Sequence, residues 1–382
     1  MESPFPYDKY VTGKNFMGRK ANCTLLGNLI SQGEHVWISA PPKTGKTSLI
    51  QQTLFGMRMC GQAFTVGQFS VLNVRTPQEF LLRMGSTAIR MVASTPAEYA
   101  QKVQQHLDGT HFVFDPAVFS ESGTVLSANW DLDEADVLAV LRLPFRLAAE
   151  TGQRLILIID EFQNVSLFDD PDTILRPLRT VLKEEQEKRC VFLFCGSRVN
   201  AMNAIFQQSI LFNRLVERVT LDPVDEKEIT EHVIKGFLSG GKVIEKDLLF
   251  GACKLFQNNL WYINHFAAIC DSMTKGYIME PVLVDALGAL LAIHEPRFES
   301  IVNSLTTFQV NLLQAVVEGE YRFSAAESIR RYGLNSSANV KRVKDALMKK
   351  EVLTFDEKEH PAFLDPLFEY WVKKYYFEIK DS

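Results

Sequence analysis

The sequence predicts an α/β protein: a parallel sheet with a phosphate-binding loop, then a helical lid, then a C-terminal winged helix-turn-helix domain. Three observations predict this order. An apolar strand near the N-terminus runs into the loop, further apolar strands alternate with helical segments, and purely helical periodicity follows from about residue 225. We therefore expect a P-loop NTPase domain at 1–223, a lid at 224–296 and a winged helix at 297–382.

The loop that follows the first strand, at 36–38, has the sequence Ala-Pro-Pro-Lys-Thr-Gly-Lys-Thr. It fits the pattern G-x-x-x-x-G-K-[ST] except at Ala40. Backbone N–H groups of such a loop bind a pyrophosphate, Lys46 reaches the β- and γ-phosphates, and the Thr47 hydroxyl ligates Mg²⁺. The flanking strand and helix favour nucleotide binding over a chance Gly-Lys-Thr. The loop residues expected to bind nucleotide are Ala40, Pro41, Pro42, Lys43, Thr44, Gly45, Lys46, Thr47 and Ser48.

An acidic pair ends a later strand. Residues 155–159 are all apolar, as in a strand buried on both faces, and Asp160 and Glu161 follow them. Ligands bind at the carboxyl ends of strands in open α/β sheets. We expect Asp160 to hold Mg²⁺ through water and Glu161 to act as general base or water-positioning group. The alternative, that an acidic pair merely ends a strand, is weakened by the phosphate loop upstream.

A third strand, at 190–196, ends beside Ser197 and Arg198. Ser197 is the stronger candidate for sensing the γ-phosphate, and Arg198 is the weaker one. Arg214 precedes a short segment of alternating apolar residues at 219–221, and we expect it to reach a phosphate in cis or in trans. For either arginine the alternative is a solvated surface charge.

These stretches resemble the archaeal-type ATPases of the STAND class, within the wider AAA+ group. The resemblance is carried by Phe16-Met17-Gly18-Arg19, the phosphate loop, Ile159-Asp160-Glu161-Phe162-Gln163 and Phe363-Leu364-Asp365-Pro366-Leu367-Phe368-Glu369-Tyr370-Trp371. It spans nearly the whole chain. It implies an AAA+-like fold, ATP and Mg²⁺ as cofactors, and an adenine site near Phe16, Gly18 and Arg19.

The chain departs from that family's pattern in four places. Ala40 replaces glycine, Asn22 or Cys23 stands where glutamate is usual, Asn73 stands at a strand end where aspartate is common, and 257–262 replaces G-x-P-x-Y. These changes spare the chemical centre. They favour slow turnover, or a member that binds ATP and hardly hydrolyses it.

Composition bounds the class of protein. The 382 residues suffice for two or three domains, and 46% hydrophobic with 23% charged residues is ordinary for a globular chain. A net charge of −5 gives no general attraction to nucleic acid or acidic lipid. No apolar run approaches the ~18 residues that span a bilayer, and residues 1–8 lack leader character. The six cysteines show no C-x-x-C spacing, so we expect reduced, mostly buried thiols in a cytoplasmic protein without a membrane partner.

The segment 94–130 has no clear periodicity and contains Pro96, Gly109, Pro116 and Gly123. We expect an irregular insertion, which is either functional or a surface excursion.

The C-terminal segment has the pattern of a winged helix. We expect a first helix from Thr307, a second with a capping box at Ser324–Glu327, a third capped by Ser336 or Asn335, and a wing around 356–360. This domain is the part of the chain expected to meet a partner.

Charge divides this domain into two parts. Seven basic against two acidic residues between 324 and 350 give +5, whereas one lysine against six acids between 351 and 371 gives −5. Lys341 and Arg342 suit DNA phosphates, but an acidic wing repels them. The sequence therefore predicts an ATP-binding, slowly hydrolysing switch protein that signals to an unknown protein partner. An ATP-modulated DNA-binding regulator and a nucleotide-binding scaffold without turnover are the alternatives.

Overall fold

The computed structural model describes residues 4–379, which fall into two compact units. The sheet unit comprises Lys20–Ala40 and Leu49–Leu221; the lid unit comprises Met1–Arg19, Pro41–Ser48 and Asp222–Ser382, within the described range. Met1–Ser3, the start of the segment predicted to lack leader character, lie outside that range. The domain borders predicted at 223 and 296 stay predictions. Among the described residues no helix is long and apolar enough to cross a membrane, and none of the six cysteines forms a disulfide.

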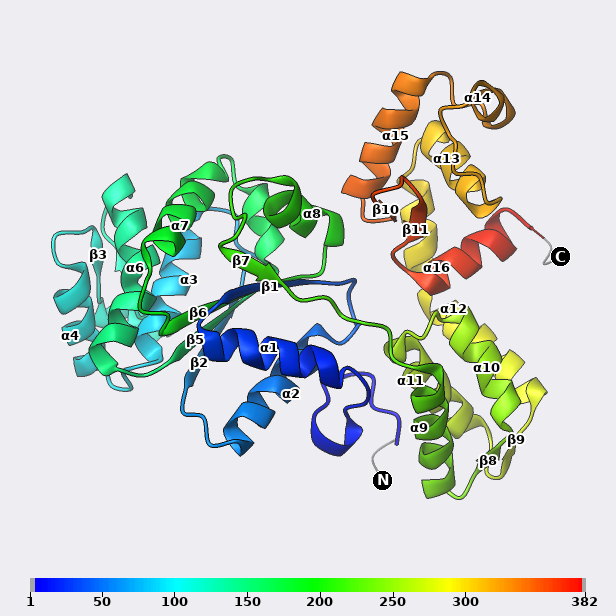
Figure 1. The fold of residues 1–382 in the computed structure, drawn as a ribbon, viewed down its shortest axis with the longest axis horizontal. Coiled ribbons are helices and arrows are strands. Elements are labelled where there is room, and N and C mark those ends of the chain that lie inside the picture. Colours follow the sequence, from blue (N-terminus) through cyan, green and yellow to red (C-terminus); the bar gives the residue numbers. More distant parts are fainter. Residues whose placement is uncertain (1–3, 380–382) are drawn as a thin grey trace. The chain divides into compact units, whose positions relative to one another are not determined.

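A five-stranded parallel sheet with the order β2-β5-β6-β1-β7 organises the sheet unit (Figure 1). Its strands are β1 (His35–Ser39), β2 (Thr65–Ser70), β5 (Leu155–Asp160), β6 (Cys190–Gly196) and β7 (Val216–Arg218). The central strands β5 and β6 are buried almost throughout, as expected for strands covered on both faces. The register pairs Ser39 with Gly196 and Ser70 with Asp160, so the carboxyl ends of four strands meet at one edge.

Helices cover both faces of this sheet. Figure 1 shows α1 (Lys20–Gln32) and α2 (Lys46–Met59) on one side of it, and α3 (Pro77–Arg90), α6 (Glu134–Thr151), α7 (Asp172–Glu184) and α8 (Val199–Asn203) on the other. Two short turns, η2 (Phe162–Leu167) and η3 (Ala204–Gln208), follow β5 and α8. This arrangement confirms the α/β class and leaves the carboxyl edge open for polar side chains.

The segment 94–130 is more regular than predicted. It contains α4 (Pro96–Leu107), α5 (Pro116–Ser122) and a small antiparallel pair, β3 (Phe112–Val113) with β4 (Ser127–Ala128). Thr95 and Glu98 form a capping box at the start of α4, a signal that the sequence carries in Thr-Pro-Ala-Glu. His111 is 2.7 Å from Asp136 of α6, which ties the insertion to the rest of the sheet unit.

The lid unit opens with a short turn, η1 (Gly13–Asn15), and its lid consists of four helices and two short parallel strands. These are α9 (Glu226–Ser239), β8 (Val243–Ile244), α10 (Lys246–Leu255), α11 (Leu260–Met273), β9 (Tyr277–Ile278) and α12 (Glu280–Asn303). The N-terminal segment belongs to the same core, because Phe5 is fully buried and its ring lies 4.6 Å from that of Phe237. Gly236 leaves room for it, since a Cβ there would lie 2.4 Å from the Phe5 ring.

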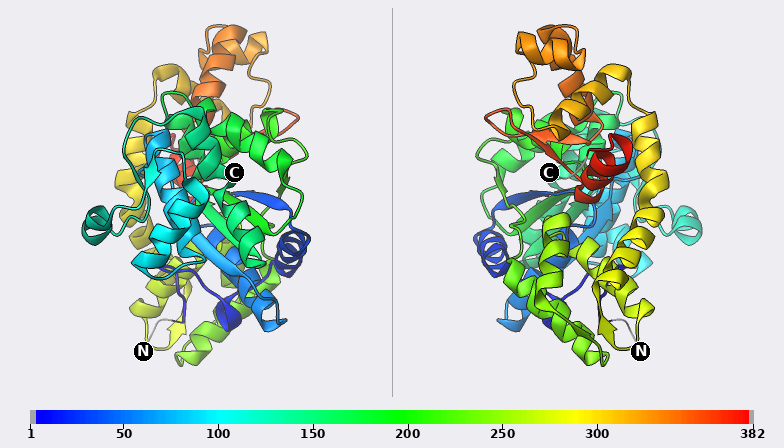
Figure 2. Two further views of the ribbon diagram at one scale, coloured as in Figure 1. Left: turned by 90° about the vertical axis from the view of Figure 1, so that its left-hand side faces the viewer. Right: turned by 90° about the vertical axis from the view of Figure 1, so that its right-hand side faces the viewer.

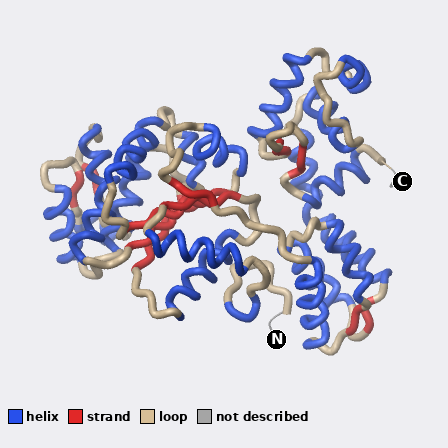
Figure 3. The backbone as a smooth tube through the Cα atoms, in the orientation of Figure 1, coloured by secondary structure: helices blue, strands red, loops and turns tan. Residues whose placement is uncertain are grey.

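The rest of the lid unit is the winged helix. Its elements are α13 (Thr307–Val317), α14 (Ala326–Tyr332), α15 (Ser337–Lys349), β10 (Leu353–Phe355), β11 (Pro361–Phe363), α16 (Pro366–Trp371) and η4 (Val372–Tyr376). Ser336 caps α15, as predicted. The capping box predicted at Ser324 is wrong, because α14 begins one residue later with Ala325 as its N-cap residue and no side-chain cap. Figure 3 shows how little strand lies outside the five-stranded sheet.

One helix is common to the lid and the winged helix. α12 runs for 24 residues without a break through Pro296, where the sequence predicted a border. Its last turns pack against α16, which Figure 2 shows beside it (α12 yellow, α16 red). Phe298 lies 5.5 Å from Phe368 and 5.7 Å from Trp371, ring centre to ring centre, so α12 contributes to the core of both parts.

Candidate nucleotide-binding site

The phosphate loop closes on the carbonyl group of Pro41. The Thr44 hydroxyl donates a hydrogen bond to this carbonyl at 2.7 Å, and Nζ of Lys46 donates to it at 3.1 Å. α2 begins at Lys46, and Thr47, its second residue, is exposed. The predicted phosphate-binding lysine therefore lies over its own loop, at the start of the helix that the sequence predicts there.

Arg19 holds this loop from the N-terminal segment. Its Nη1 donates to the carbonyl of Thr44 at 2.7 Å. Gly45 has φ of 98°, and a Cβ there would lie 2.9 Å from the same Nη1. Gly18 has φ of 62°, and its Cβ would lie 2.8 Å from the Val224 side chain. Both glycines are therefore required by a left-handed backbone and a close approach together.

A pocket in the lid unit is formed by three stretches: the N-terminal segment, the phosphate loop and the start of α11. Its empty volume, open mouth included, is about 560 Å³. The lining residues are Pro6, Tyr7, Lys9, Val11, Asn15, Phe16, Met17, Arg19, Lys43, Thr44, Gly45, Ser48, Leu260, Trp261 and Asn264. Of the residues predicted near adenine, Phe16 and Arg19 line this pocket. Gly18 lies between two lining residues and is not itself one of them.

The residue of α11 that approaches the loop is Trp261. Its Nε1 donates to the carbonyl of Tyr7 at 2.7 Å, and the Lys43 ammonium lies 5.8 Å from the centre of its ring. The Tyr7 ring stacks on His265 at 4.1 Å, and burial lowers the pKa of His265, which keeps that imidazole neutral. Sequence analysis missed Tyr7, Trp261 and Asn264 as site residues, because partners more than 250 residues apart leave no local pattern.

In the sheet unit, the acidic pair lies at the carboxyl edge. Asp160 is the last residue of β5, and Glu161 follows it with φ of 55°. The Glu161 carboxylate accepts hydrogen bonds from the Ser197 hydroxyl at 2.7 Å and from the Gln163 amide at 2.5 Å. Gly196 makes room for the Gln163 side chain, since a Cβ at position 196 would lie 2.4 Å from Oε1 of Gln163. Glu161 and Ser197 thus meet as side chains, while their catalytic roles stay predictions.

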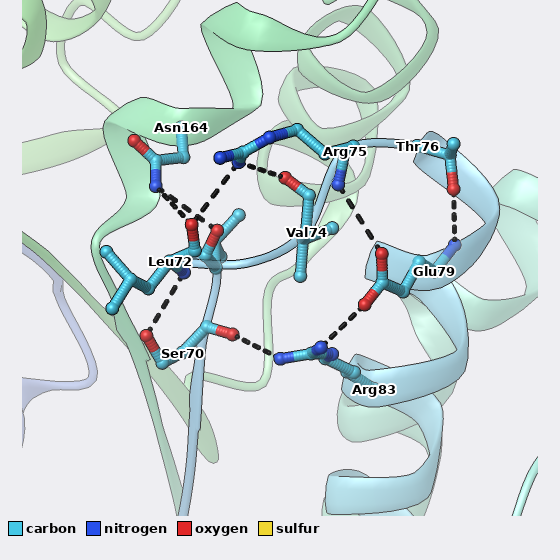
Figure 4. Close-up of polar contacts among 9 residues, drawn as sticks. Ser70, Leu72, Val74, Arg75, Thr76, Glu79, Arg83 and Asn164 are labelled. Atoms are coloured by element: carbon cyan, nitrogen blue, oxygen red, sulfur yellow. Dashed lines mark hydrogen bonds and ion pairs between the residues drawn. The ribbon is translucent and has the colours of Figure 1, made fainter.

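The turn that follows β2 begins beside Asp160, whose carbonyl accepts from Val71 N–H, and Figure 4 shows the hydrogen bonds within and around this turn. Asn164 donates its amide to the carbonyl of Leu72 at 3.1 Å, and Arg83 donates to the carbonyl of Ser70 at 3.1 Å. β2 ends at Ser70, so Asn73 lies within the turn and not at a strand end as predicted. Further bonds from Arg75 and Glu79 close the turn.

Arg214 lies at the other edge of the sheet. It is exposed and stands two residues before Val216, the first residue of β7, which pairs with His35, the first residue of β1. Because β1 and β7 are parallel, Arg214 is at the amino ends of the strands, whereas Glu161 and Ser197 are at the carboxyl ends. This placement argues against the predicted reach in cis, and a reach in trans stays a prediction. Arg198, the N-cap residue of α8, is at the carboxyl edge.

The basic face of the winged helix is on α15. Lys341 and Arg342 are exposed, but Lys344 contacts Glu359 of the wing, and its ammonium lies 4.3 Å from the centre of the Phe355 ring. Burial lowers the pKa of Lys344. One of the basic groups of this helix is therefore engaged within the domain, which leaves a smaller positive surface than the sequence suggests.

Comparisons with known proteins agree with this architecture. The family model described as "Probable winged helix domain" matches residues 296–374. No curated protein matches the chain. Among solved structures, the Walker-type ATPase PABY2304 of Pyrococcus abyssi is similar at 14% identity, with 97% of this chain and 99% of that chain covered and a TM-score of 0.67.

The ORC2 protein of Aeropyrum pernix is also similar. Its structure in ADPNP–ADP complexes matches at 13% identity over 94% of this chain and 93% of that chain, with a TM-score of 0.55. Its ADP form matches at 14% identity over the same shares, also with a TM-score of 0.55. At such identities the likeness establishes the fold alone. The chain therefore has the fold of AAA+ Walker-type ATPases, with a helical lid and a C-terminal winged helix.

Proposed function

We propose that this protein is an ATP-binding switch that hydrolyses ATP slowly and passes its nucleotide state to a protein partner through the winged helix. The observation that carries the proposal is the pocket of the lid unit, where the phosphate loop, the N-terminal segment and α11 meet. A base between apolar side chains with its phosphates on a P-loop explains why these three stretches converge. ORC2, of similar fold, has been solved with ADPNP and ADP.

The phosphates are assigned to the loop and to Lys46, which would exchange the Pro41 carbonyl for phosphate oxygens. The hydroxyl of Thr47 and the carboxylate of Asp160 are hard oxygen donors, which is the donor set that Mg²⁺ prefers. When bound, Mg²⁺ would neutralise charge on the phosphates. Thr47 is exposed, and Asp160 is the last residue of β5.

The proposed slow turnover rests on Glu161. A water-positioning carboxylate must turn an oxygen toward the attacking water. Here one carboxylate oxygen, Oε2, accepts hydrogen bonds from both Ser197 and Gln163, and these bonds must weaken before that oxygen can serve. This arrangement supports a switch whose hydrolysis is gated, rather than an enzyme of fast turnover.

Signalling to a partner is assigned to the path from α11 to the winged helix. Trp261 lines the pocket, and the next residue, Tyr262, donates its hydroxyl to Asp365 at 2.9 Å. Asp365 also pairs with Arg297 of α12 at 2.6 Å and caps α16. The pocket residue Trp261 is therefore directly followed in sequence by a residue that contacts the N-cap of α16.

The experiment is calorimetry of ATP and Mg²⁺ with the wild type and with Lys46→Ala. Removing a charge-assisted contact of about 1.5–3 kcal/mol should weaken binding roughly 10- to 150-fold. Lys183→Ala, an exposed lysine near the end of α7, is the matched control and should bind like the wild type. Equal affinity of Lys46→Ala and the wild type would remove the phosphate-loop assignment.

A further inference from the structure

One side chain of the pocket contains a buried acceptor that the proposed function has not used. Asn264 is 9% exposed and lies on α11 three residues after Trp261 and four after Leu260, so these three side chains share one face of the helix. Its Oδ1 is buried and has no hydrogen-bond partner among the described residues.

The orientation of this amide follows from its neighbour. Nδ2 of Asn264 donates to the backbone carbonyl of Pro6 at 3.2 Å. The reversed amide would place two oxygen atoms against each other, so Oδ1 is the atom left without a partner. A buried acceptor without a donor carries a cost that a ligand donor can remove.

The charged side chains of the pocket offer only donors. Lys9, Lys43 and Arg19 carry no acceptor atom. The carbonyl of Tyr7 is already bonded to Trp261, and the Ser48 hydroxyl accepts from Val11 N–H. A base with a carbonyl oxygen at the position that faces Asn264 would leave Oδ1 unpaired, whereas a base with an amino group at that position would satisfy it.

We propose that Asn264 determines base specificity by accepting a hydrogen bond from the 6-amino group of adenine, with Trp261 and Phe16 as apolar surfaces for the ring. This inference rests on the proposed function, because it names the base that the same pocket takes. Guanine and hypoxanthine carry an oxygen at position 6, which would meet Oδ1 acceptor to acceptor. An unsubstituted purine would leave Oδ1 without a donor.

The test uses the full-length wild type and three ligands with Mg²⁺: ATP, purine riboside 5′-triphosphate and ITP. We expect ATP to bind about 10-fold or more tightly than the unsubstituted purine nucleotide, and ITP to bind more weakly still. Equal affinities for the three would overturn the base assignment and leave the phosphate-loop assignment standing. Failure of all three to bind would overturn the proposed function itself.

A variant isolates the residue. In Asn264→Ala the three ligands should bind within about 3-fold of one another, because the acceptor is gone, whereas Asn213→Ala on an exposed turn of the sheet unit should keep the wild-type ratios. If a folded Asn264→Ala protein still prefers ATP over the other two nucleotides, a residue other than Asn264 selects the base. If this variant does not fold, the ligand series on the wild type still decides.

Discussion

At the scale of single residues, Glu161 is the most informative group of the sheet unit. Glu161→Gln keeps the shape and removes the basicity, so we expect ATP binding within about 3-fold of wild type and hydrolysis at least 100-fold slower, the range of general-base effects. Single-turnover phosphate release beside calorimetry measures both quantities. If the wild type releases no phosphate above background, the protein is a nucleotide-binding scaffold and not an ATPase.

Ser197 gives a second prediction for the same group. Ser197→Ala removes one of the two hydrogen bonds that Oε2 of Glu161 accepts. If these bonds restrain Glu161, hydrolysis should rise a few-fold; if Ser197 senses the γ-phosphate, hydrolysis should fall 10-fold or more while binding persists. The direction of the change in single-turnover rate therefore separates the two roles.

The site residues divide by how far apart their partners lie in sequence. The places of Lys46 and Thr47 at a helix start and of Asp160 at a strand end could be predicted, because the strand, loop and acidic pair around them are local patterns, and their roles stay predictions. Tyr7 and Asn264 could not, since each acquires its place from a partner about 250 residues away. The place of Arg214 at the amino ends of the strands likewise depends on the parallel pairing of β7 with β1, and no local sequence pattern reveals that pairing.

At the scale of elements, β1 carries a pH-sensitive group. Burial lowers the pKa of His35 to about 4, and its Nδ1 accepts from the Phe192 N–H at 3.1 Å. The unfolded chain takes up this proton near pH 6.5, so stability is lost as the pH falls from 6.5 toward 4, by about 3 kcal/mol at pH 4.

Urea unfolding from pH 7.5 to 4 tests this statement. His35→Phe should lower stability at every pH, because the Phe192 N–H loses its acceptor, yet flatten the decline between pH 6.5 and 4. His360→Phe, at an exposed histidine of the wing, should leave the steep decline in place. A decline as steep in His35→Phe as in the wild type would contradict the prediction.

The contact of α11, α12 and α16 through Asp365 gives another element-scale prediction. Asp365→Asn keeps the cap of α16 but weakens the pair with half-exposed Arg297, a loss of about 0.5–1 kcal/mol. Asp365→Ala also removes the cap and should cost about 1–2 kcal/mol more. Denaturant unfolding orders the two variants, and a smaller loss for Asp365→Ala than for Asp365→Asn would contradict this account.

Helices and strands were predicted where regularly spaced apolar residues extend over a long segment, and they were missed where such a segment is short. The strands β1, β5 and β6 and the helices of the lid follow from runs of apolar residues at spacings of one strand or one helix turn. β2 and β7 lie before the segments where the sequence suggested them, around Asn73 and at 219–221. α4 was missed, although Thr95 and Glu98 signal its start, because prolines and glycines interrupt the segment. α14 has Ala325 and not Ser324 as its N-cap residue, although serine is the better capping residue by type.

At the scale of the whole molecule, the charge on the winged helix favours a protein over DNA as its proposed partner. Lys341 and Arg342 are exposed, but Lys344 is engaged by the acidic wing. Binding carried by so few phosphate contacts is weak already at low salt, and added salt weakens it further. We expect the wild type to retain duplex DNA weakly at low salt and Lys341→Ala/Arg342→Ala to retain it more weakly still, and we expect both proteins to lose it at physiological salt. Micromolar retention at physiological salt that this double variant abolishes would falsify the protein-partner assignment.

The lid and the winged helix share α12, so a nucleotide-dependent movement should carry both as one body. Tyr262, Arg297 and Asp365 reinforce this connection at its centre. In the proposed switch, the signal would be the position of the lid and the winged helix together and not a change inside the winged helix. Hydrogen exchange with and without ATP should leave protection inside α13–α15 unaltered.

The position of Trp261 allows ligand binding to be followed by intrinsic tryptophan fluorescence. Of the four tryptophans, Trp37 and Trp371 are buried at 2% and 6% exposure, and Trp130 is 74% exposed. Trp261 alone lines the pocket. A ligand that fills the pocket shields one indole from iodide and shifts its emission, while the other three report unchanged surroundings. Occupancy can thus be followed by intrinsic fluorescence, without a label and without waiting for turnover.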